Sequence, residues 1–320
     1  MKLKLCSLAF FAVLLAALPL FTDEPPMFTL HQVGPGVFAA IDIPQSRAGS
    51  NSGFIIGEDG VAVVDTFESA DAARALLGEI RKQTKLPVRY VVNTHYHLDH
   101  VAGNGVFAEA GATIFAQRNV RDWIHTENLK FFRNLQPEQK KLVEGLVAPQ
   151  VVYNADGVDL FLGARRISVR VLPGHTGGDS VVYVPDAHVV FCGDLFWRHT
   201  LPNLIDASTA VWIESDGKLL AAGPQAVFVP GHGEVGNAAD VAAFRDYLIF
   251  LRQSVQPAVA QSKSGDELVN SVLPVLKAKY GDWDFFPFFS RSNILQTADE
   301  LAGKKKVPQE SPEWFEFSAR

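Results

Sequence analysis

The chain has 320 residues, of which 48% are hydrophobic and 20% charged, a balance typical of a globular enzyme with a substantial core. Its formal net charge of -6 at pH 7 gives no electrostatic reason to expect a nucleic acid as partner. The two cysteines, Cys6 and Cys192, argue against a disulfide framework, because Cys6 lies in the N-terminal apolar segment described next.

The N-terminal residues have the layout of a secretory signal peptide. Lys2 and Lys4 precede an apolar run over residues 5–21, which is too short for a comfortable transmembrane span. We therefore predict that residues 1–22 direct export and are removed. The mature protein is then secreted or periplasmic and has no stable membrane insertion. The alternatives are an uncleaved membrane anchor, or a cytoplasmic protein whose translation starts at Met27.

From residue 28 onward, short runs typical of β-strands alternate with stretches typical of helices. Glycine-bounded apolar runs predict strands over residues 36–41, 53–57 and 60–65. Residues 70–83 carry apolar side chains at helical spacing and are predicted to form a helix. Further strands are predicted over residues 88–93, 113–116, 167–171, 180–184, 188–191 and 226–229. The alternation indicates a layered α/β architecture, in which loops at strand ends carry the chemistry.

The C-terminal part of the chain is predicted to be helical and then aromatic. Residues 238–252 and 266–279 have helical character, and residues 282–289 are rich in Phe and Trp. We expect this aromatic run to fold back onto the body, either as plain packing or as a lip over an active site. Residues 28–251 are assigned to the main domain, and residues 252–320 to an extension packed on it.

The segment Thr94–His100, THYHLDH, concentrates metal-ligand chemistry. Three imidazoles and one carboxylate within a few positions are rarely a packing solution, because each buried polar group needs a partner. Imidazole nitrogen is the commonest protein ligand of zinc, and aspartate oxygen also binds this ion. His95 and His97 are two positions apart and can point the same way on an extended segment. Asp99 and His100 follow where the loop turns, and can address a second ion.

Three further candidate ligands lie downstream. His175 lies in the glycine-rich run GHTGGDS, where the backbone can approach an ion closely. Asp194 follows a predicted strand in FCGDL, and His232 follows the next one in PGHG. Each of these signals is weak by itself, but together and in this order they are specific.

This ordered set resembles the metallo-β-lactamase superfamily over roughly residues 28–251. The resemblance implies an αββα fold, with two mixed sheets packed face to face, helices outside and the metals at one edge. It implies a first metal ion on His95, His97 and His175, a second on Asp99, His100 and His232, and Asp194 bridging the two. Asp65 matches the strand-end aspartate that supports the histidine loop in this family.

Two departures from subgroup patterns narrow the function. His97 is not the glutamate found in the diiron flavoprotein branch, which favours hydrolysis over redox chemistry. Some β-lactamases have a cysteine where Asp194 stands, whereas Cys192 is expected to be a small buried residue. An aspartate bridge resembles glyoxalase II, lactonases and phosphodiesterases, but the leader is more typical of β-lactamases.

The implied chemistry uses two zinc ions that share a water and lower its pKa. Asp99 would orient that water for attack on a carbonyl, besides binding metal, and is the candidate for proton transfer to the leaving group. Asp179 is a candidate partner of an imidazole or a cap of the following element. His199, a few residues after the Asp194 strand, is a candidate substrate contact.

We therefore predict a zinc-dependent hydrolase that cleaves an amide or ester carbonyl of a small molecule, as β-lactamases and lactonases do. One alternative is a glyoxalase II-type thioesterase, with Lys263, Lys277 and Lys279 as candidate grips for glutathione. Others are a mononuclear iron persulfide dioxygenase and a metal-binding module that has lost catalysis. The loops over residues 44–52, 125–149 and 201–215 are expected to shape the pocket.

Overall fold

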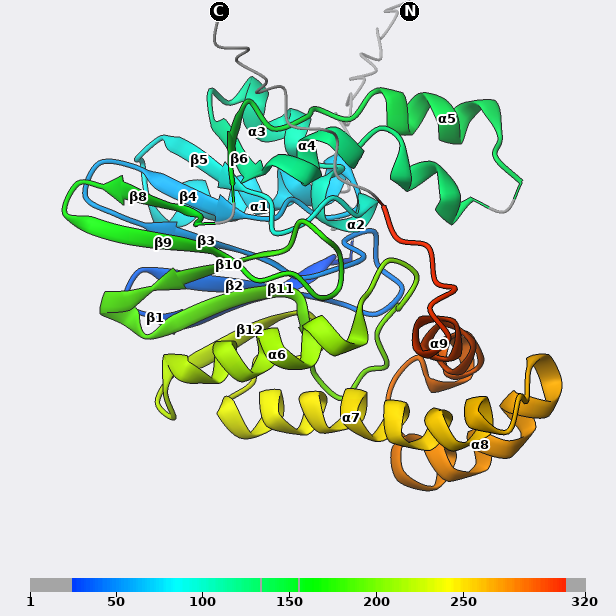
Figure 1. Ribbon diagram of the computed structural model, residues 1–320. Coiled ribbons are helices and arrows are strands. Elements are labelled where there is room, and N and C mark those ends of the chain that lie inside the picture. The colour runs from blue at the N-terminus through cyan, green and yellow to red at the C-terminus, as the bar shows by residue number, and fades with distance from the viewer. Residues whose placement is uncertain (1–24, 133, 155, 309–320) are drawn as a thin grey trace, which may run out of the picture.

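A computed structural model describes residues 25–308 except 133 and 155, so the predicted leader lies outside the described residues. The protein has four layers, with two β-sheets packed face to face and helices on both outer faces (Figure 1). The predicted αββα fold is thereby confirmed. In the part of the chain that is described, no helix is both long enough and apolar enough to span a lipid bilayer.

The first sheet has seven strands, which follow one another in chain order. They are β1 (Phe28–Gly34), β2 (Val37–Asp42), β3 (Ser52–Ile56), β4 (Val61–Val64), β5 (Val88–Val92), β6 (Thr113–Gln117) and β7 (Val151–Tyr153). Pairing is antiparallel from β1 to β4 and parallel from β4 to β7. The sheet is therefore mixed, as the family resemblance implies.

The second sheet has five strands in the order β12-β11-β10-β9-β8. They are β8 (Val158–Leu162), β9 (Arg165–Val171), β10 (Ser180–Val184), β11 (Val189–Trp197) and β12 (Val227–His232). Only β11 and β12 pair in parallel among the described strands of this sheet. The strand predicted to end near Asp194 continues to Trp197, so Asp194 lies within β11.

Helices cover the two sheets from outside. The helices that follow the first sheet's strands are α1 (Ala70–Gln83), α2 (Leu98–Val101), α3 (Asn104–Glu109), α4 (Arg118–Trp123), η1 (Glu127–Phe131) and α5 (Pro137–Glu144). Those associated with the second sheet and the extension are η2 (Pro185–Ala187), α6 (Thr209–Leu219), η3 (Leu220–Ala222), α7 (Ala238–Ala260), α8 (Gly265–Tyr280) and α9 (Phe286–Leu301). The expected domain boundary after residue 251 falls inside α7, and α7, α8 and α9 share one apolar core with β10, β11 and β12.

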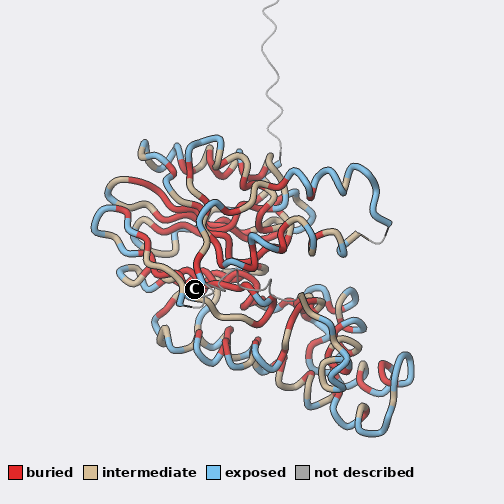
Figure 2. The backbone as a smooth tube through the Cα atoms, turned by 45° about the horizontal axis from the view of Figure 1, so that its top comes forward, coloured by how far each residue is buried: buried red, intermediate tan, exposed pale blue. Residues whose placement is uncertain are grey.

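Successive residues along a strand of the first sheet pack alternately into two different hydrophobic cores, one on each face of the sheet. In β2, Val37, Ala39 and Ile41 join the core between the sheets, whereas Phe38 and Ala40 join the core beneath α1 and α3. This is the expected result of side chains pointing to opposite faces at successive positions. Figure 2 shows that the buried backbone is concentrated in these strands. The site is thus mounted on strands that are buried on both faces.

Asp216 is a buried carboxyl in α6 that has no role in the site described below. It is fully buried, and neither carboxyl oxygen has a hydrogen-bond partner within the described residues. Burial raises its pKa well above the ordinary range, although Arg245 opposes the shift. Folding at pH 7 must therefore protonate a group that is ionised in the unfolded chain, and this cost disappears below the unfolded pKa of about 4.

We expect Asp216→Asn to stabilise the protein at pH 7 by roughly 1 kcal/mol, or about 1–2 °C in Tm. The gain should shrink as the pH approaches 4, because wild-type Asp216 then needs no proton uptake on folding. Thermal unfolding of both proteins at the two pH values measures this difference. A variant that is less stable than wild type at pH 7 would show that Asp216 is ionised in the fold.

Candidate metal centre

The seven predicted ligands come from four separate segments that meet at one end of the two sheets. His95 and His97 lie in the loop after β5, and Asp99 and His100 lie in the short helix α2 that follows. His175 lies between β9 and β10, Asp194 within β11, and His232 at the end of β12. The structure therefore brings together residues that are separated by more than a hundred positions in sequence.

The ligand atoms form two groups. His95, His97, His175 and Asp194 offer atoms that lie within 4.8 Å of one another, and Asp99, His100 and His232 do the same. In the first group, Nε2 of His175 is 3.0 Å from Nδ1 of His97. In the second group, Oδ2 of Asp99 is 3.3 Å from Nε2 of His232 and 3.4 Å from Nε2 of His100. Both spacings suit ligands that share one ion.

Asp194 lies between the two groups and directs one oxygen at each. Its Oδ2 is 3.1 Å from Nε2 of His175 and 3.7 Å from Nε2 of His95. Its Oδ1 is 3.1 Å from Nε2 of His100 and 3.5 Å from Nε2 of His232. This is the arrangement expected of a carboxylate that bridges two ions.

Several atoms at the centre are buried without a hydrogen-bond partner among the described residues. They are the Nε2 atoms of His95, His100 and His232 and Oδ1 of Asp194. Leaving buried polar atoms unsatisfied costs about 1–3 kcal/mol each. Bound divalent cations would satisfy all of them, and nitrogen and carboxylate donors suit zinc. The residues therefore fit a pair of metal ions.

The charges of the two groups differ. Burial lowers the pKa of His95 and of His97, so both imidazoles are neutral and available as ligands. Burial opposes protonation of His232 too, but Asp194 and Asp99 outweigh it and raise the pKa of His232 to about 9. The pKa of His100 is raised well above its usual value, since Asp194, Asp99 and Asp65 outweigh burial.

Asp65 holds the histidine loop in place. Its carboxylate accepts hydrogen bonds from the Thr94 backbone N–H (2.7 Å) and the Thr94 hydroxyl (2.7 Å), and lies 2.8 Å from Nδ1 of His100. A hydrogen bond to Nδ1 leaves Nε2 of His100 directed at the metal centre. Asp65 therefore connects the backbone of the histidine loop to one of its imidazoles, and its predicted role in supporting a metal-bound loop stays a prediction.

Asp179 fixes the turn that carries His175. Its carboxylate accepts hydrogen bonds from the backbone N–H groups of Gly174 (2.9 Å) and Thr176 (2.7 Å) and from the Thr176 hydroxyl. Burial raises the pKa of Asp179 to about 6. Of the two roles predicted for Asp179, these bonds correspond to capping the backbone.

Two motif glycines are required by close approach. A Cβ atom at position 231 would lie 1.9 Å from Oδ1 of Asp194. At position 193 it would lie 2.4 Å from Oγ1 of Thr94, and the backbone there has φ +51°, a conformation that favours glycine. The glycines beside Asp194 and His232 therefore let the strand ends and the histidine loop meet.

Asp206 is a functional candidate that the sequence pattern did not reveal. Its carboxylate lies 3.2 Å from Nε2 of His97 and also accepts hydrogen bonds from the Tyr96 hydroxyl and from Nζ of Lys130. With Nε2 occupied in this way, Nδ1 of His97 faces the first group of ligands. Asp206 follows β11 in an irregular segment without a recognisable motif, so only the fold identifies it.

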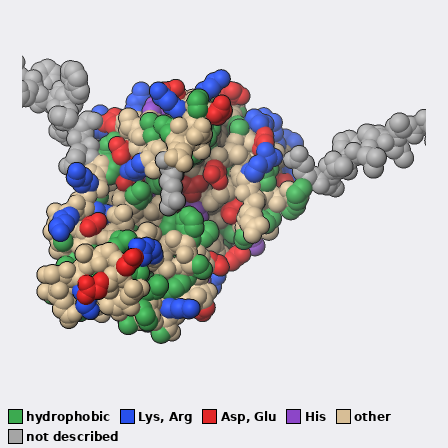
Figure 3. All heavy atoms as spheres, turned by 90° about the vertical axis from the view of Figure 1, so that its right-hand side faces the viewer, with side chains coloured by type: hydrophobic (Ala, Val, Ile, Leu, Met, Phe, Trp, Pro, Cys, Tyr) green, Lys and Arg blue, Asp and Glu red, His purple; other side chains and the backbone are tan. Residues whose placement is uncertain are grey.

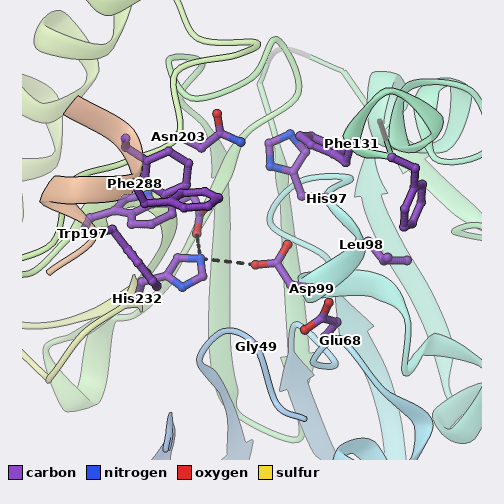
Figure 4. A pocket seen from close by; sticks show the side chains of 14 residues that line it. Gly49, Glu68, His97, Leu98, Asp99, Phe131, Trp197, Asn203, His232 and Phe288 are labelled. Carbon is purple, nitrogen blue, oxygen red and sulfur yellow. Dashed lines mark ion pairs between the residues drawn. The ribbon is translucent and has the colours of Figure 1, made fainter. Parts of the chain in front are cut away.

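A pocket of about 420 Å³ opens beside the centre (Figure 4). Each loop predicted to shape the pocket contributes to it: Gly49 from the first, Phe131 and Phe132 from the second, and Asn203 from the third. The other lining residues are Glu68, His97, Leu98, Asp99, Asp194, Trp197, His232, Phe285, Phe288 and Phe289. None of these described lining residues is Lys or Arg.

His199 does not line this pocket. Its backbone has φ +53°, and its ring lies 5.6 Å from the ring of Trp283, measured between centroids. A substrate contact at His199 thus stays a prediction. Cys192 is buried and lies outside both groups of ligands, in agreement with its expected role as a small packing residue.

Several known proteins are similar to this chain in sequence. A sequence model of the metallo-beta-lactamase superfamily matches residues 46–232. A linear primary-alkylsulfatase from a Pseudomonas species is 25% identical over 263 residues, which cover 69% of this chain and 50% of that protein. A hydroxyacylglutathione hydrolase from Brucella anthropi is 27% identical over 183 residues, covering 57% and 61%. The chain thus spans less than two thirds of the length of these relatives.

The fold is also similar to that of solved structures. A metallo-beta-lactamase from Pontibacter korlensis superposes with a TM-score of 0.58 at 21% sequence identity. The superposition covers 69% of this chain and 99% of that protein. The rest of this chain has no counterpart in that superposition.

Proposed function

This chain belongs to the metallo-β-lactamase superfamily, and from that premise we propose that it is a two-zinc hydrolase of an amide or ester carbonyl, of the β-lactamase or lactonase kind. The main support for the proposal is the position of Asp194, which presents one carboxylate oxygen to each group of ligands. Bound zinc ions would lower the pKa of a water toward neutrality and polarise the carbonyl oxygen of the substrate. His95, His97 and His175 would hold one ion, Asp99, His100 and His232 the other, and Asp194 both.

Asp99 is the residue best placed to orient a water beside the metal centre. It lines the pocket, and its side chain is 28% exposed whereas that of Asp194 is 3% exposed. Although burial opposes ionisation, His100 and His232 hold the pKa of Asp99 well below its usual range. Asp99 is therefore ionised at neutral pH and can accept a hydrogen bond from a water, which orients that water for attack on the carbonyl.

The thioesterase alternative has less support from the pocket. A glutathione thioester carries carboxylates, and the residues predicted to grip them are lysines of the C-terminal helices. Lys279 instead lies over the ring of Phe250, 4.4 Å from its centroid, and neither Lys277 nor Lys263 lines the pocket. An alkyl sulfate likewise carries an anionic group for which the pocket lining offers no Lys or Arg. A lactone, which carries no anionic group, is the better match among carbonyl substrates, whereas a β-lactam carries a carboxylate for which a bound zinc ion would have to be the counter-ion.

A hydrolysis panel on zinc-loaded protein tests the reaction class. It would compare a chromogenic β-lactam, an acyl lactone, a glutathione thioester, an alkyl sulfate and an aryl phosphodiester. Hydrolysis of the lactam or lactone is expected, with zinc bound and no oxygen consumed. Iron in the isolated protein together with oxygen uptake on a persulfide would overturn the proposal in favour of a dioxygenase.

We also propose that the enzyme acts outside the cytoplasm. The support is the basic N-terminal end followed by the apolar run over residues 5–21. Fractionation of expressing cells tests this proposal, and recovery of full-length protein in the cytoplasm alone would contradict it.

Asp206→Asn should weaken the centre without unfolding the protein. The change preserves shape but removes the negative charge that orients His97, and loss of such a partner typically costs about 10–100-fold in metal affinity or activity. Zinc content after dialysis against buffered free zinc, together with kcat/KM, measures the effect. Asp186→Asn is the matched control, since Asp186 pairs with Arg165 at the surface. Equal zinc affinity in both variants would remove Asp206 from the machinery.

A further inference from the structure

Aromatic rings line the pocket on two sides of the candidate metal centre. Figure 4 places Phe131 and Phe288 on opposite sides of His97 and Asp99. The ring of Phe131 contacts that of His97 edge-on, with centroids 4.9 Å apart. On the other side, Trp197 stacks on His232 with centroids 3.9 Å apart. A group bound between these walls would lie directly beside the ligands of both ions.

The second wall is built by the start of α9. Phe288 and Phe289 lie in the first turn of α9, and Phe285 is the residue just before it. All three line the pocket. The ring centroids of Phe288 and Phe289 are 4.7 Å apart, and those of Phe285 and Phe289 are 5.7 Å apart. The opposite face of α9 is buried in the core against α7 and α8. Part of the aromatic run over residues 282–289 therefore packs in the core, and the rest forms a lip at the pocket.

Hydrogen bonds connect the start of α9, which forms the second wall, to the segment that follows β11. The Leu201 backbone N–H donates to the Asp284 carbonyl, and the Asp284 N–H donates to the His199 carbonyl, both at 2.9 Å. The Asn293 amide donates to the Pro202 carbonyl at 3.0 Å. Since β11 also carries Asp194 and Trp197, the wall and the metal centre are parts of one rigid frame.

Two of the three rings of the lip are exposed, whereas Phe289 is half-buried against the core. Phe288 is 73% exposed and Phe285 49% exposed. The backbone of Phe285 has φ +58°, which is unusual for a bulky residue and marks a position fixed by its surroundings. Exposed apolar groups beside a pocket with a few polar groups are typical of ligand sites. The space-filling view shows hydrophobic side chains beside the hollow that holds acidic groups (Figure 3).

The acidic side chains of the pocket disfavour a substituent that ends in a negative charge. Glu68 and Asp99 line it, and no Lys or Arg does so among the described residues. Lys130, the cation on η1 next to Phe131, has Nζ paired with Asp206 and with Glu127. A carboxylate at the far end of a substituent would find no Lys or Arg in the described lining and would approach Glu68.

We propose that the substrate carries an uncharged apolar substituent, such as a medium-length acyl chain, which binds between Phe131 and the lip of Phe285, Phe288 and Phe289. The inference rests on the proposed hydrolase function, because the chain would extend from the carbonyl that the metal centre attacks. The pocket of about 420 Å³ is in the range that holds one small molecule.

The test compares lactones that carry a butanoyl or a decanoyl side chain, and one whose decanoyl chain ends in a carboxylate. Each fully buried methylene group contributes about fourfold in affinity. With partial burial, we expect kcat/KM to be at least about tenfold higher for the decanoyl lactone than for the butanoyl lactone. The carboxylate-ended lactone should lose this preference.

Phe288→Ser removes the most exposed ring of the lip and should reduce the decanoyl-to-butanoyl ratio of kcat/KM by about three- to tenfold. Phe161→Ser is the matched control, because Phe161 is 54% exposed in β8 and does not line the pocket. This control should keep the wild-type ratio. A ratio near one in wild type, or an unchanged ratio in Phe288→Ser, would overturn the inference while leaving the hydrolase function intact.

Binding without turnover separates the two proposals. Decanol should displace a neutral naphthylamine dye from the zinc-loaded protein, and should do so more weakly from Phe288→Ser than from Phe161→Ser. If this displacement is seen but no carbonyl substrate is hydrolysed, the apolar site stands and the proposed reaction falls. If decanol fails to displace the dye and the lactones are hydrolysed without chain preference, the apolar site falls.

Discussion

Replacing Asp194 with alanine is expected to lower kcat/KM by at least about a thousandfold, equivalent to roughly 4 kcal/mol of transition-state stabilisation. No other residue among the candidate ligands presents atoms to both groups, so its loss would remove a ligand from each of the two proposed ions. The substitution also removes the nearest counter-charge of His100 and His232, whose pKa values Asp194 raises. The substitution should therefore lower the metal affinity and leave His100 and His232 with less compensating negative charge.

Asp194→Asn sharpens this experiment, because it keeps the side-chain volume and removes only the charge. Zinc content by mass spectrometry should fall from about two ions per chain to one or fewer, in parallel with kcat/KM. Asp216→Asn supplies the matched control, since Asp216 is another buried aspartate but lies outside both groups of ligands. Full activity and two bound ions in Asp194→Asn would rule out a bridging role.

The strands and the first helix could be predicted because local pattern and tertiary environment agree there. Residues 70–83 form α1 with the predicted bounds, since Ser69 caps the first turn and Leu76 and Ile80 meet the sheet on one face. By contrast, the pattern did not reveal β1, whose residues after Phe28 are mostly half-buried or exposed at the edge of its sheet. Strands with one face toward solvent carry a weaker signal than strands buried on both faces.

The predicted ligands could be found because their side-chain chemistry is rare and concentrated. Asp206 and Phe288 could not, because an aspartate in a loop and a phenylalanine in an aromatic run have many ordinary explanations. Their roles depend on contacts that only the fold creates: Asp206 meets His97 across 109 positions of sequence. The lip could not be predicted because it depends on where α9 begins, at Phe286, and on the backbone of Phe285 just before it.

Removing zinc is expected to lower Tm by roughly ten degrees or more. An ion that binds the folded state at a thousand times its Kd contributes about 4 kcal/mol, and two such ions about twice that. For a chain of this size, each kcal/mol corresponds to about 1–2 °C. Thermal unfolding with excess zinc and with a chelator measures the difference. An unchanged Tm would mean that the folded protein binds no zinc.

The two proposed zinc ions should also differ in how their binding depends on pH. In the ion-free protein, His100 and His232 have raised pKa values, about 9 for His232, so both carry protons at pH 7. An ion entering their group must displace these protons, and its affinity should therefore rise with pH until about pH 9. His95 and His97 have lowered pKa values and are already neutral, so the other ion should bind with little proton release near pH 7.

Calorimetric titration with zinc in two buffers of different ionisation enthalpy counts the protons released in each step. We expect close to two protons for the ion of the His100–His232 group, and close to none for the ion of the His95–His97 group. Asp99→Asn should reduce the count in the first of these groups, because Asp99 raises the pKa of His232 and of His100. Asp186→Asn should leave it unchanged. Equal proton release in the two steps would mean that the carboxylates do not hold these imidazoles in their charged form.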